Sequence, residues 1–144
     1  MKGDKIPDQD HIARLCMPRT VTEDGHIQAA AFFLKDDEEG LSVNWLEFLD
    51  CSNREDEINE LRDVYSAKLT VGAKAKIIVL NVGQICKKVF IYNPNRRKIK
   101  ILHAPECDPV PDPSHSEIYN LRPDYEIIAE LILQTDHSTH SARI

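Results

Sequence analysis

The pattern of apolar and polar positions along the chain predicts a series of short strands. Apolar runs of about four to eight residues, continuous or alternating, are typical of strands. Such runs occur at residues 11–17, 27–34, 41–48, 76–82, 90–92 and 98–103. The runs 27–34 and 41–48 flank an acidic connection ending in Gly40, and 90–92 and 98–103 flank the turn-forming sequence Asn93-Pro94-Asn95-Arg96. We therefore expect each of these pairs to form a β-hairpin.

Two other segments carry apolar residues at helical spacing. The first has Ile58, Leu61, Tyr65 and Leu69, and the second has Tyr125, Ile128, Leu131 and Ile132. Ser52 and Glu55 form a capping box before the first segment, and Pro123 stands at the favoured first position of the second. These segments predict two principal helices, and residues 81–89 predict a shorter one.

Together these elements predict one α+β domain with a mixed or mainly antiparallel sheet of five to six strands and two principal helices. A length of 144 residues suits a single domain with its own core. We place that domain at residues 1–136 and expect the polar residues 137–144 to form a flexible C-terminal tail. The first ten residues are also expected to fray. Four prolines in residues 104–114 predict a stiff extended loop, called here the Pro-rich loop.

Composition favours a cytoplasmic protein. The N-terminal residues lack the apolar region of a secretory signal, and no apolar run reaches the roughly 18 residues that span a membrane. The four cysteines, Cys16, Cys51, Cys86 and Cys107, include no C-x-x-C pair. Reduced thiols are therefore expected, with neither a disulfide framework nor a metal site, and no cofactor is expected.

Charge is distributed very unevenly along the chain. Residues 64–105 contain no Asp or Glu but hold half of the eighteen Lys and Arg residues. The formal net charge of −6 hides this division. We call the nine residues the basic block: Lys68, Lys74, Lys76, Lys87, Lys88, Arg96, Arg97, Lys98 and Lys100. A surface of one sign attracts a partner of the opposite sign.

Several roles are open for the basic block. It can be a solvated sheet face whose lysines protect an edge strand from aggregation, or it can pair with the acidic helical segment 55–63. It can also bind an acidic protein. Because Lys87, Lys88, Arg96, Arg97, Lys98 and Lys100 are interleaved with Phe90 and Tyr92, RNA or single-stranded DNA is a further possible partner.

Two histidines flank the Pro-rich loop and define an alternative, catalytic interpretation. His103 and His115 have the chemistry for a general base and general acid on a phosphodiester, as in a metal-independent ribonuclease. Asp112 is then expected to orient His115, and Tyr119 to assist. Zinc ligation by this segment fits no standard spacing. The alternative is a structural role, in which each imidazole makes only local hydrogen bonds.

A third set lies near the N-terminus: His11, Arg14, Ser42, Asn44 and Glu47. An Arg that holds a phosphate and a Glu that holds a ribose hydroxyl would suit nucleotide chemistry of the ADP-ribosyl-transfer kind. The alternative is that Trp45 anchors the core and Glu47 pairs at the surface. Phosphate-binding glycine motifs and the G-x-S-x-G and H-E-x-x-H motifs are absent from the sequence.

Two short strings, residues 41–47 (LSVNWLE) and 112–119 (DPSHSEIY), resemble small uncharacterised bacterial proteins. The resemblance covers a small part of the chain. It implies a bacterial, cytoplasmic, single-domain protein and no particular activity.

The sequence as a whole favours a small recognition or accessory module. Its acid-free segment is expected to bind an acidic partner, in the first place a protein and in the second place a nucleic acid. The contacts are expected from the basic hairpin (the hairpin predicted from residues 90–92 and 98–103, with its neighbouring Lys and Arg residues) and from the Pro-rich loop. The expected contacts are Lys87, Lys88, Tyr92, Arg96, Arg97, Lys98 and Lys100. Neither a membrane partner nor a particular oligomeric state is predicted.

Overall fold

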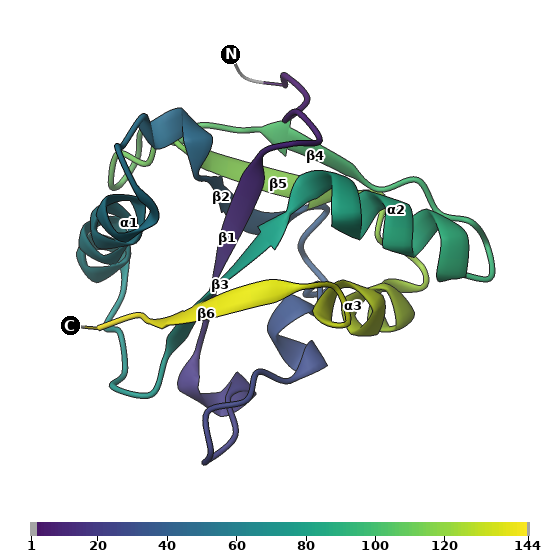
Figure 1. The fold of residues 1–144 in the computed structure, drawn as a ribbon, viewed down its shortest axis with the longest axis horizontal. Helices are drawn as coiled ribbons and strands as arrows, with labels where there is room; N and C mark the ends of the chain where they lie inside the picture. The colour runs from purple at the N-terminus through teal and green to yellow at the C-terminus, as the bar shows by residue number, and fades with distance from the viewer. Residues whose placement is uncertain (1–2, 144) are drawn as a thin grey trace.

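The computed structural model describes residues 3–143 and contains one antiparallel sheet of six strands within that range (Figure 1). The spatial order is β4-β5-β2-β1-β3-β6. The strands are β1 (His11–Cys16), β2 (Leu41–Trp45), β3 (Lys76–Asn81), β4 (Lys100–His103), β5 (His115–Tyr119) and β6 (His137–Ser141). The helices are α1 (Arg54–Lys68), α2 (Val82–Tyr92) and α3 (Tyr125–Leu133). The α+β class with a mainly antiparallel sheet is confirmed.

The two faces of the sheet are covered by different helices. Figure 1 shows the sheet running between α1 on one side and α2 and α3 on the other. Strand β3 contributes to both faces, because Ile78 and Leu80 belong to the core cluster under α2 and α3, whereas Ile77 and Val79 belong to the cluster under α1. This continuous apolar strand is buried on both sides, as its sequence predicted.

Helix α1 begins one residue later than the predicted capping box. Asn53 is the N-cap, and its side-chain oxygen accepts a hydrogen bond of 2.9 Å from the backbone N–H of Asp56. Ile58, Leu61 and Tyr65 are buried against the sheet, as their spacing predicted. Near its C-terminal end the helix carries Tyr65 and Lys68, which contact Asn44 and Asp112.

Both expected hairpins are wrong. Residues 27–34 contain a short 3-10 helix at Ala29–Phe32, and β2 pairs with β1 and β5 instead. Residues 90–92 form the last turn of α2, because Asn81 caps that helix and Val82, Ile85 and Val89 bury one side of it. Strand β5, which the sequence analysis did not propose, pairs with both β2 and β4.

The expected flexible tail is a strand up to Ser141. Strand β6 pairs with β3 over its whole length, Ala142 is buried, and the Arg62 guanidinium donates two hydrogen bonds to the Ser141 carbonyl. Main-chain pairing orders this polar segment without an apolar pattern. Only residue 144 of the expected tail lies outside the described residues. Near the other end, Ile6 is buried and its N–H donates to the carbonyl of Ile101 in β4.

Candidate functional site

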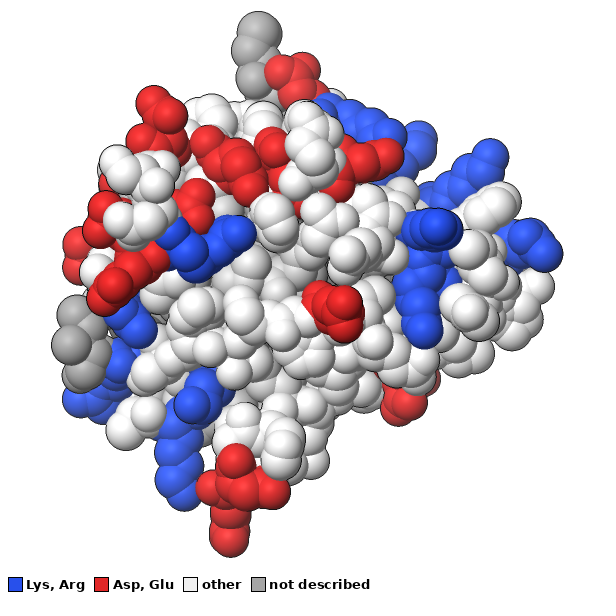
Figure 2. Space-filling model, viewed as in Figure 1, with Lys and Arg blue, Asp and Glu red and all other residues white. Residues whose placement is uncertain are grey.

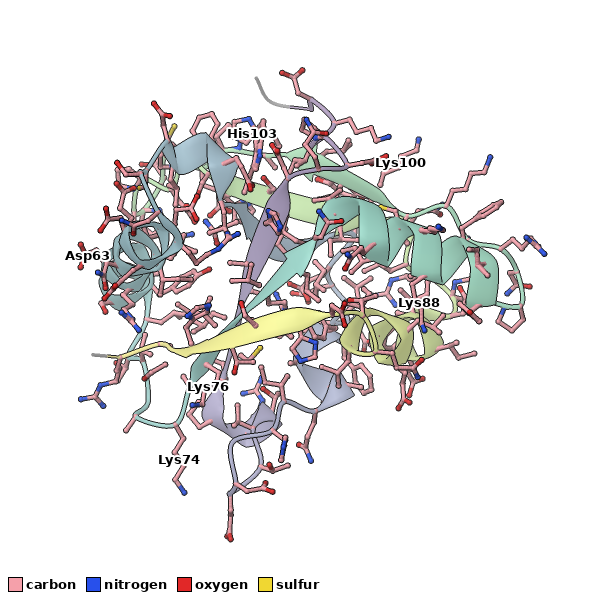
Figure 3. All side chains as sticks on the ribbon, viewed as in Figure 1. Asp63, Lys74, Lys76, Lys88, Lys100 and His103 are labelled. Carbon is pink, nitrogen blue, oxygen red and sulfur yellow. The ribbon has the colours of Figure 1, made fainter. Side chains whose placement is uncertain are left out.

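The fold divides the basic block into separate groups. Lys68 contacts two carboxylates of the Pro-rich loop, with Nζ 2.5 Å from Asp112 Oδ2 and 3.0 Å from Glu106 Oε1. Lys74 and Lys76 lie at the opposite end of the molecule from Lys88 and Lys100 (Figure 3). The nine basic residues therefore do not form one continuous surface.

Five members of the block remain together at the surface over α2 and β4. They are Lys87, Lys88, Arg96, Lys98 and Lys100, and within residues 3–143 none of them lies within ion-pair distance of a carboxylate. Figure 2 shows blue side chains gathered over these elements and red ones mainly over α1. Arg97 differs, since its Nη2 atom lies 3.0 Å from Asp124 Oδ1. Arg97, which was among the residues expected to bind the partner, therefore forms an intramolecular ion pair with Asp124 instead.

A groove between α2 and β4 lies inside this positive surface and encloses about 720 Å³. Its apolar lining consists of the partly exposed Cys86, Phe90 and Leu102, together with core residues such as Val82, Ile99 and Ile101 that are almost fully buried. Its cationic lining residues are Lys5, Lys87, Lys98 and Lys100, and Asp8 is the one acidic lining residue among those described. An apolar groove with a few polar groups is the usual form of a binding site.

Three of the cationic side chains on this surface make cation–π contacts with aromatic rings. The Lys88 Nζ atom lies 4.5 Å from the centre of the Tyr92 ring. Lys98 Nζ and Arg96 Cζ each lie 5.6 Å from the centre of the Phe90 ring. Such cation–π contacts orient a charge without neutralising it, so these side chains remain available to an anionic partner.

The Pro-rich loop does not join this surface. Its carboxylates Glu106 and Asp112 bind Lys68 at the end of α1, which covers the other face of the sheet. The loop is also acidic, so it would repel an acidic partner. The expectation that loop and basic residues form one binding surface is therefore corrected.

The structure does not bring His103 and His115 into one site. His103 pairs with Ser116 in the β4–β5 ladder, so its neighbour His115 points to the opposite face. His103 is buried, with its ring centre 5.3 Å from that of Trp45, and its Nε2 lies 2.7 Å from the Pro113 carbonyl. This is the structural role left open by the sequence.

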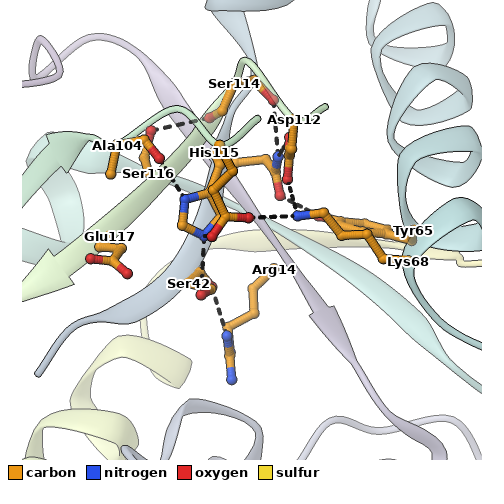
Figure 4. A network of polar contacts seen from close by, with 12 residues as sticks. Arg14, Ser42, Tyr65, Lys68, Ala104, Asp112, Ser114, His115, Ser116 and Glu117 are labelled. Atoms are coloured by element: carbon orange, nitrogen blue, oxygen red, sulfur yellow. Dashed lines mark hydrogen bonds and ion pairs between the residues drawn. The ribbon is translucent and has the colours of Figure 1, made fainter. Parts of the chain in front are cut away.

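His115 instead borders a polar cleft near the C-terminal end of α1 (Figure 4). Its Nε2 lies 3.1 Å from Ser42 Oγ, and its Nδ1 lies 2.7 Å from the carbonyl of Ala104. The cleft encloses about 300 Å³. We call it the polar cleft; its lining residues include Arg14, Ser42, Asn44, Lys68 and His115.

Asp112 stabilises the wall of this cleft and does not orient His115. Its buried carboxylate accepts hydrogen bonds from Asn44 Nδ2 (2.8 Å) and Lys68. The Tyr65 hydroxyl donates to Asn44 Oδ1 (2.8 Å), and burial raises the pKa of Tyr65. The Tyr119 hydroxyl donates to Glu117, and this hydrogen bond is the main reason why the pKa of Tyr119 is raised to about 12. The expected roles of Asp112 and Tyr119 beside His115 are thus corrected.

Arg14 occupies the gap where β1 and β2 separate. The two strands pair only at Ile12–Trp45 and Ala13–Asn44. Beyond these pairs, Arg14 Nε donates to the Ala31 carbonyl and Nη1 to the Ser42 carbonyl, each at 2.6 Å. Desolvation lowers the pKa of this guanidinium. Among the described residues no carboxylate lies within ion-pair distance of it.

The third predicted set is divided as well. Arg14, Ser42 and Asn44 line the polar cleft, but His11 and Glu47 pair with each other, with Nδ1 2.7 Å from Oε2. Trp45 donates its indole N–H to Asp10 (2.9 Å). Because Glu47 pairs with His11 outside the cleft, Arg14 and Glu47 do not form the phosphate-binding and ribose-binding arrangement expected for ADP-ribosyl transfer.

Two features of these sites were missed from the sequence. Lys5 joins the groove only because the N-terminal segment pairs with β4, and no local pattern indicated this. The partnership of Ser42 with His115 depends on β5. The alternation of Ser116 and Ile118 with Glu117 and Tyr119 is a strand signal that could have predicted β5.

Within residues 3–143, no group of three or more His, Cys, Asp or Glu side chains is arranged to hold a metal ion. Over the same residues, every helix falls short of the length and apolar character needed to cross a bilayer. The chain matches no family model, no curated protein and no solved structure.

Proposed function

We propose that this protein is a recognition module that binds an acidic, partly apolar protein segment in the groove between α2 and β4. One observation carries the proposal: four lysines line a partly apolar groove, and Asp8, which lies 3.9 Å from Lys5, is the one acidic side chain among its described lining residues. Positive charge selects an acidic partner, and the apolar lining supplies area that a purely electrostatic contact lacks.

The lining of the groove favours a protein over a nucleic acid. Single-stranded nucleic acids bind by stacking bases on exposed aromatic rings. Here the partly exposed apolar lining residues are Cys86, Phe90 and Leu102, and the one aromatic ring among them, Phe90, is partly covered by Lys98 and Arg96. Tyr92 is 62% exposed but already lies under Lys88. Apolar side chains between acidic ones therefore suit the groove better than bases do.

A matched pair of charge reversals tests this proposal. Lys98→Glu with Lys100→Glu changes the groove, whereas Lys74→Glu with Lys76→Glu makes the same charge change at the other end of the molecule. The probe is a labelled peptide of alternating Glu and Leu, and oligo-dT serves as the nucleic-acid comparison. Fluorescence anisotropy is measured at low and at physiological salt.

We expect peptide affinity to fall at least tenfold in the groove variant and less than twofold in the control, with salt weakening the wild-type complex. Equal losses in the two variants would show that net charge, and not the groove, attracts the peptide. Preference for oligo-dT over the peptide would replace the protein partner with a nucleic acid. Absence of binding to either probe would remove the proposal.

A further inference from the structure

The polar cleft contains a serine and a histidine placed as a nucleophile and its general base. Ser42 Oγ lies 3.1 Å from His115 Nε2, on a different face of the sheet from the α2–β4 groove. We propose that the polar cleft is a hydrolytic site in which Ser42 attacks a small carboxylic ester and His115 accepts the serine proton. This activity goes beyond the recognition function and does not depend on it.

The backbone determines which nitrogen of His115 carries the proton. A carbonyl oxygen can only accept a hydrogen bond, so the contact between Nδ1 and the Ala104 carbonyl places the proton on Nδ1. In the neutral imidazole, Nε2 then carries the lone pair, and Ser42 Oγ at 3.1 Å is closer to it than Glu106 Oε2 at 3.7 Å. This is the tautomer that a general base needs to activate a hydroxyl.

Both partners are held by strands rather than by loops. Asn44 pairs with His115 in the β2–β5 ladder, so Ser42, two residues away, lies on the same face. The Ala104 N–H also donates to the His115 carbonyl (2.9 Å), which fixes the imidazole against its acceptor. A catalytic pair on strands keeps its geometry better than one on a mobile loop.

Arg14 places positive charge and N–H donors beside Ser42. A guanidinium has five N–H donors, and the Ala31 and Ser42 carbonyls use two of Arg14's, so three remain. A cation withdrawn from water without a carboxylate partner is costly unless an anion meets it. Lys68, by contrast, is already neutralised by Asp112 and Glu106. We assign to Arg14 the stabilisation of the oxyanion that forms when Ser42 attacks.

The reaction needs only the ester and water. Ser42 Oγ forms a bond to the carbonyl carbon as its proton passes to His115 Nε2, and the carbonyl oxygen becomes an oxyanion beside Arg14. When the oxyanion collapses, the carbon–alkoxide bond breaks and His115 gives its proton to the departing alcohol. Water, deprotonated by His115, then attacks the acyl-serine. Collapse of that second intermediate releases the carboxylic acid and returns the proton to Ser42.

The dimensions of the cleft limit the substrate to a small ester. A volume of about 300 Å³ is at the lower end of the range for ligand pockets. Leu15, Met17 and Leu69 give the cleft an apolar side on which an acyl chain would lie. An ester with a short acyl chain is therefore the substrate class we infer.

Covalent labelling tests the nucleophile directly. Diisopropyl fluorophosphate forms a phosphorus–oxygen bond with an activated serine, releases fluoride and transfers the serine proton to its base. We expect one adduct, located on Ser42 by peptide mass spectrometry. Ser42→Ala should abolish it, and His115→Gln should slow it by about 100-fold or more. Hydrolysis of 4-nitrophenyl acetate should fall about 100-fold in Arg14→Lys.

The chain offers a matched control for simple proximity. Ser138 Oγ also lies 3.1 Å from a histidine Nε2, that of His140, but this pair is exposed on edge strand β6. Ser138→Ala should leave labelling and hydrolysis unchanged. All variants carry Cys107→Ser, because that exposed thiol can react with the ester. Circular dichroism verifies that each variant is folded.

Several results would overturn the assignment: an adduct on Ser138, no adduct on Ser42 in folded protein, or hydrolysis that survives Ser42→Ala. Labelling should also be unaffected by Lys98→Glu with Lys100→Glu. That variant separates this site from the recognition groove, so failure of either proposal can be recognised without the other.

Discussion

Lys68 Nζ lies 2.5 Å from Asp112 Oδ2, and this ion pair joins the end of α1 to the Pro-rich loop. Asp112 is 1% exposed, so the ion pair with Lys68 and the hydrogen bond from Asn44 must compensate for the water that its carboxylate loses on burial. Lys68 also contacts Glu106, and these two carboxylates raise its pKa despite the opposing effect of desolvation. The pair thus forms one wall of the polar cleft.

Removing the lysine should destabilise the fold strongly. Lys68→Met leaves the buried Asp112 carboxylate without its cation, and we expect a loss of about 3 kcal/mol in the free energy of unfolding. Lys74→Met, at an exposed lysine with no carboxylate contact in the described structure, should change it by less than about 0.5 kcal/mol. Unfolding in urea, monitored by Trp45 fluorescence, measures the free energy of unfolding of both variants. Similar values for the two variants would show that the ion pair does not stabilise the loop.

Asp124 is expected to make stability pH-dependent on the acid side. Burial raises the pKa of its carboxyl, but hydrogen bonds from Asn93 and Asn95 and the charge of Arg97 outweigh this, so the folded-state pKa lies below the ordinary value for Asp. A carboxyl with a lowered folded pKa contributes stability above its unfolded pKa of about 3.9 and loses it as the pH falls through the folded value.

Asp124→Asn should therefore cost about 1–3 kcal/mol near neutral pH, and the difference from wild type should shrink below about pH 4. Glu126→Gln, at an exposed position in the first turn of α3, is the control and should have almost no effect. Unfolding curves measured across this pH range give the comparison. A difference that stays constant into acid would assign the loss to packing and not to the charge.

Strand β6 should be required for stability. Truncation after Asp136 removes the pairing with β3, the buried Ala142 and the acceptor of two Arg62 hydrogen bonds. We expect the midpoint of thermal unfolding to fall by at least about 10 °C, or folding to be lost, because β3 would become an exposed apolar edge. Truncation after Arg143, which keeps the whole of β6, is the control. A stable protein ending at Asp136 would contradict the assigned role of β6.

The four thiols should differ greatly in reactivity. Cys107 is exposed, whereas burial raises the pKa of Cys16 to about 12 and that of Cys86 to about 11. Because the thiolate is the reactive form, iodoacetamide at mildly alkaline pH should modify Cys107 first and leave Cys16 unmodified in folded protein. Mass spectrometry over time follows each site. Rapid modification of Cys16 would indicate that its core cluster opens readily.

Local sequence was enough for the elements whose own residues define them. Helix α1 has an acidic first turn and a periodic apolar face, and β3 is a continuous apolar run, so both were predicted near their observed bounds. Residues 90–92 and 137–141 were not, because one extends a helix and the other is ordered by pairing with a distant strand. The local pattern records neither of these influences.

The candidate sites show the same division. The acid-free segment includes Lys87, Lys98 and Lys100, which line the groove, but it also includes Lys68 and Arg97, which carboxylates outside the segment neutralise. The sequence singled out His115 but paired it with His103 and Asp112, whereas its imidazole contacts Ser42. Ser42 stood in a separate set because the register of β2 against β5 was not known.

By itself, the sequence determined the fold class, the main helix and central strand, and the separation of positive from negative charge along the chain. Those properties follow from side chains close together in sequence. Tertiary structure alone decided which lysines remain free, which face each histidine occupies and that Ser42 meets His115. Such relationships depend on strand register, and a shift of one residue reverses the face that every side chain occupies.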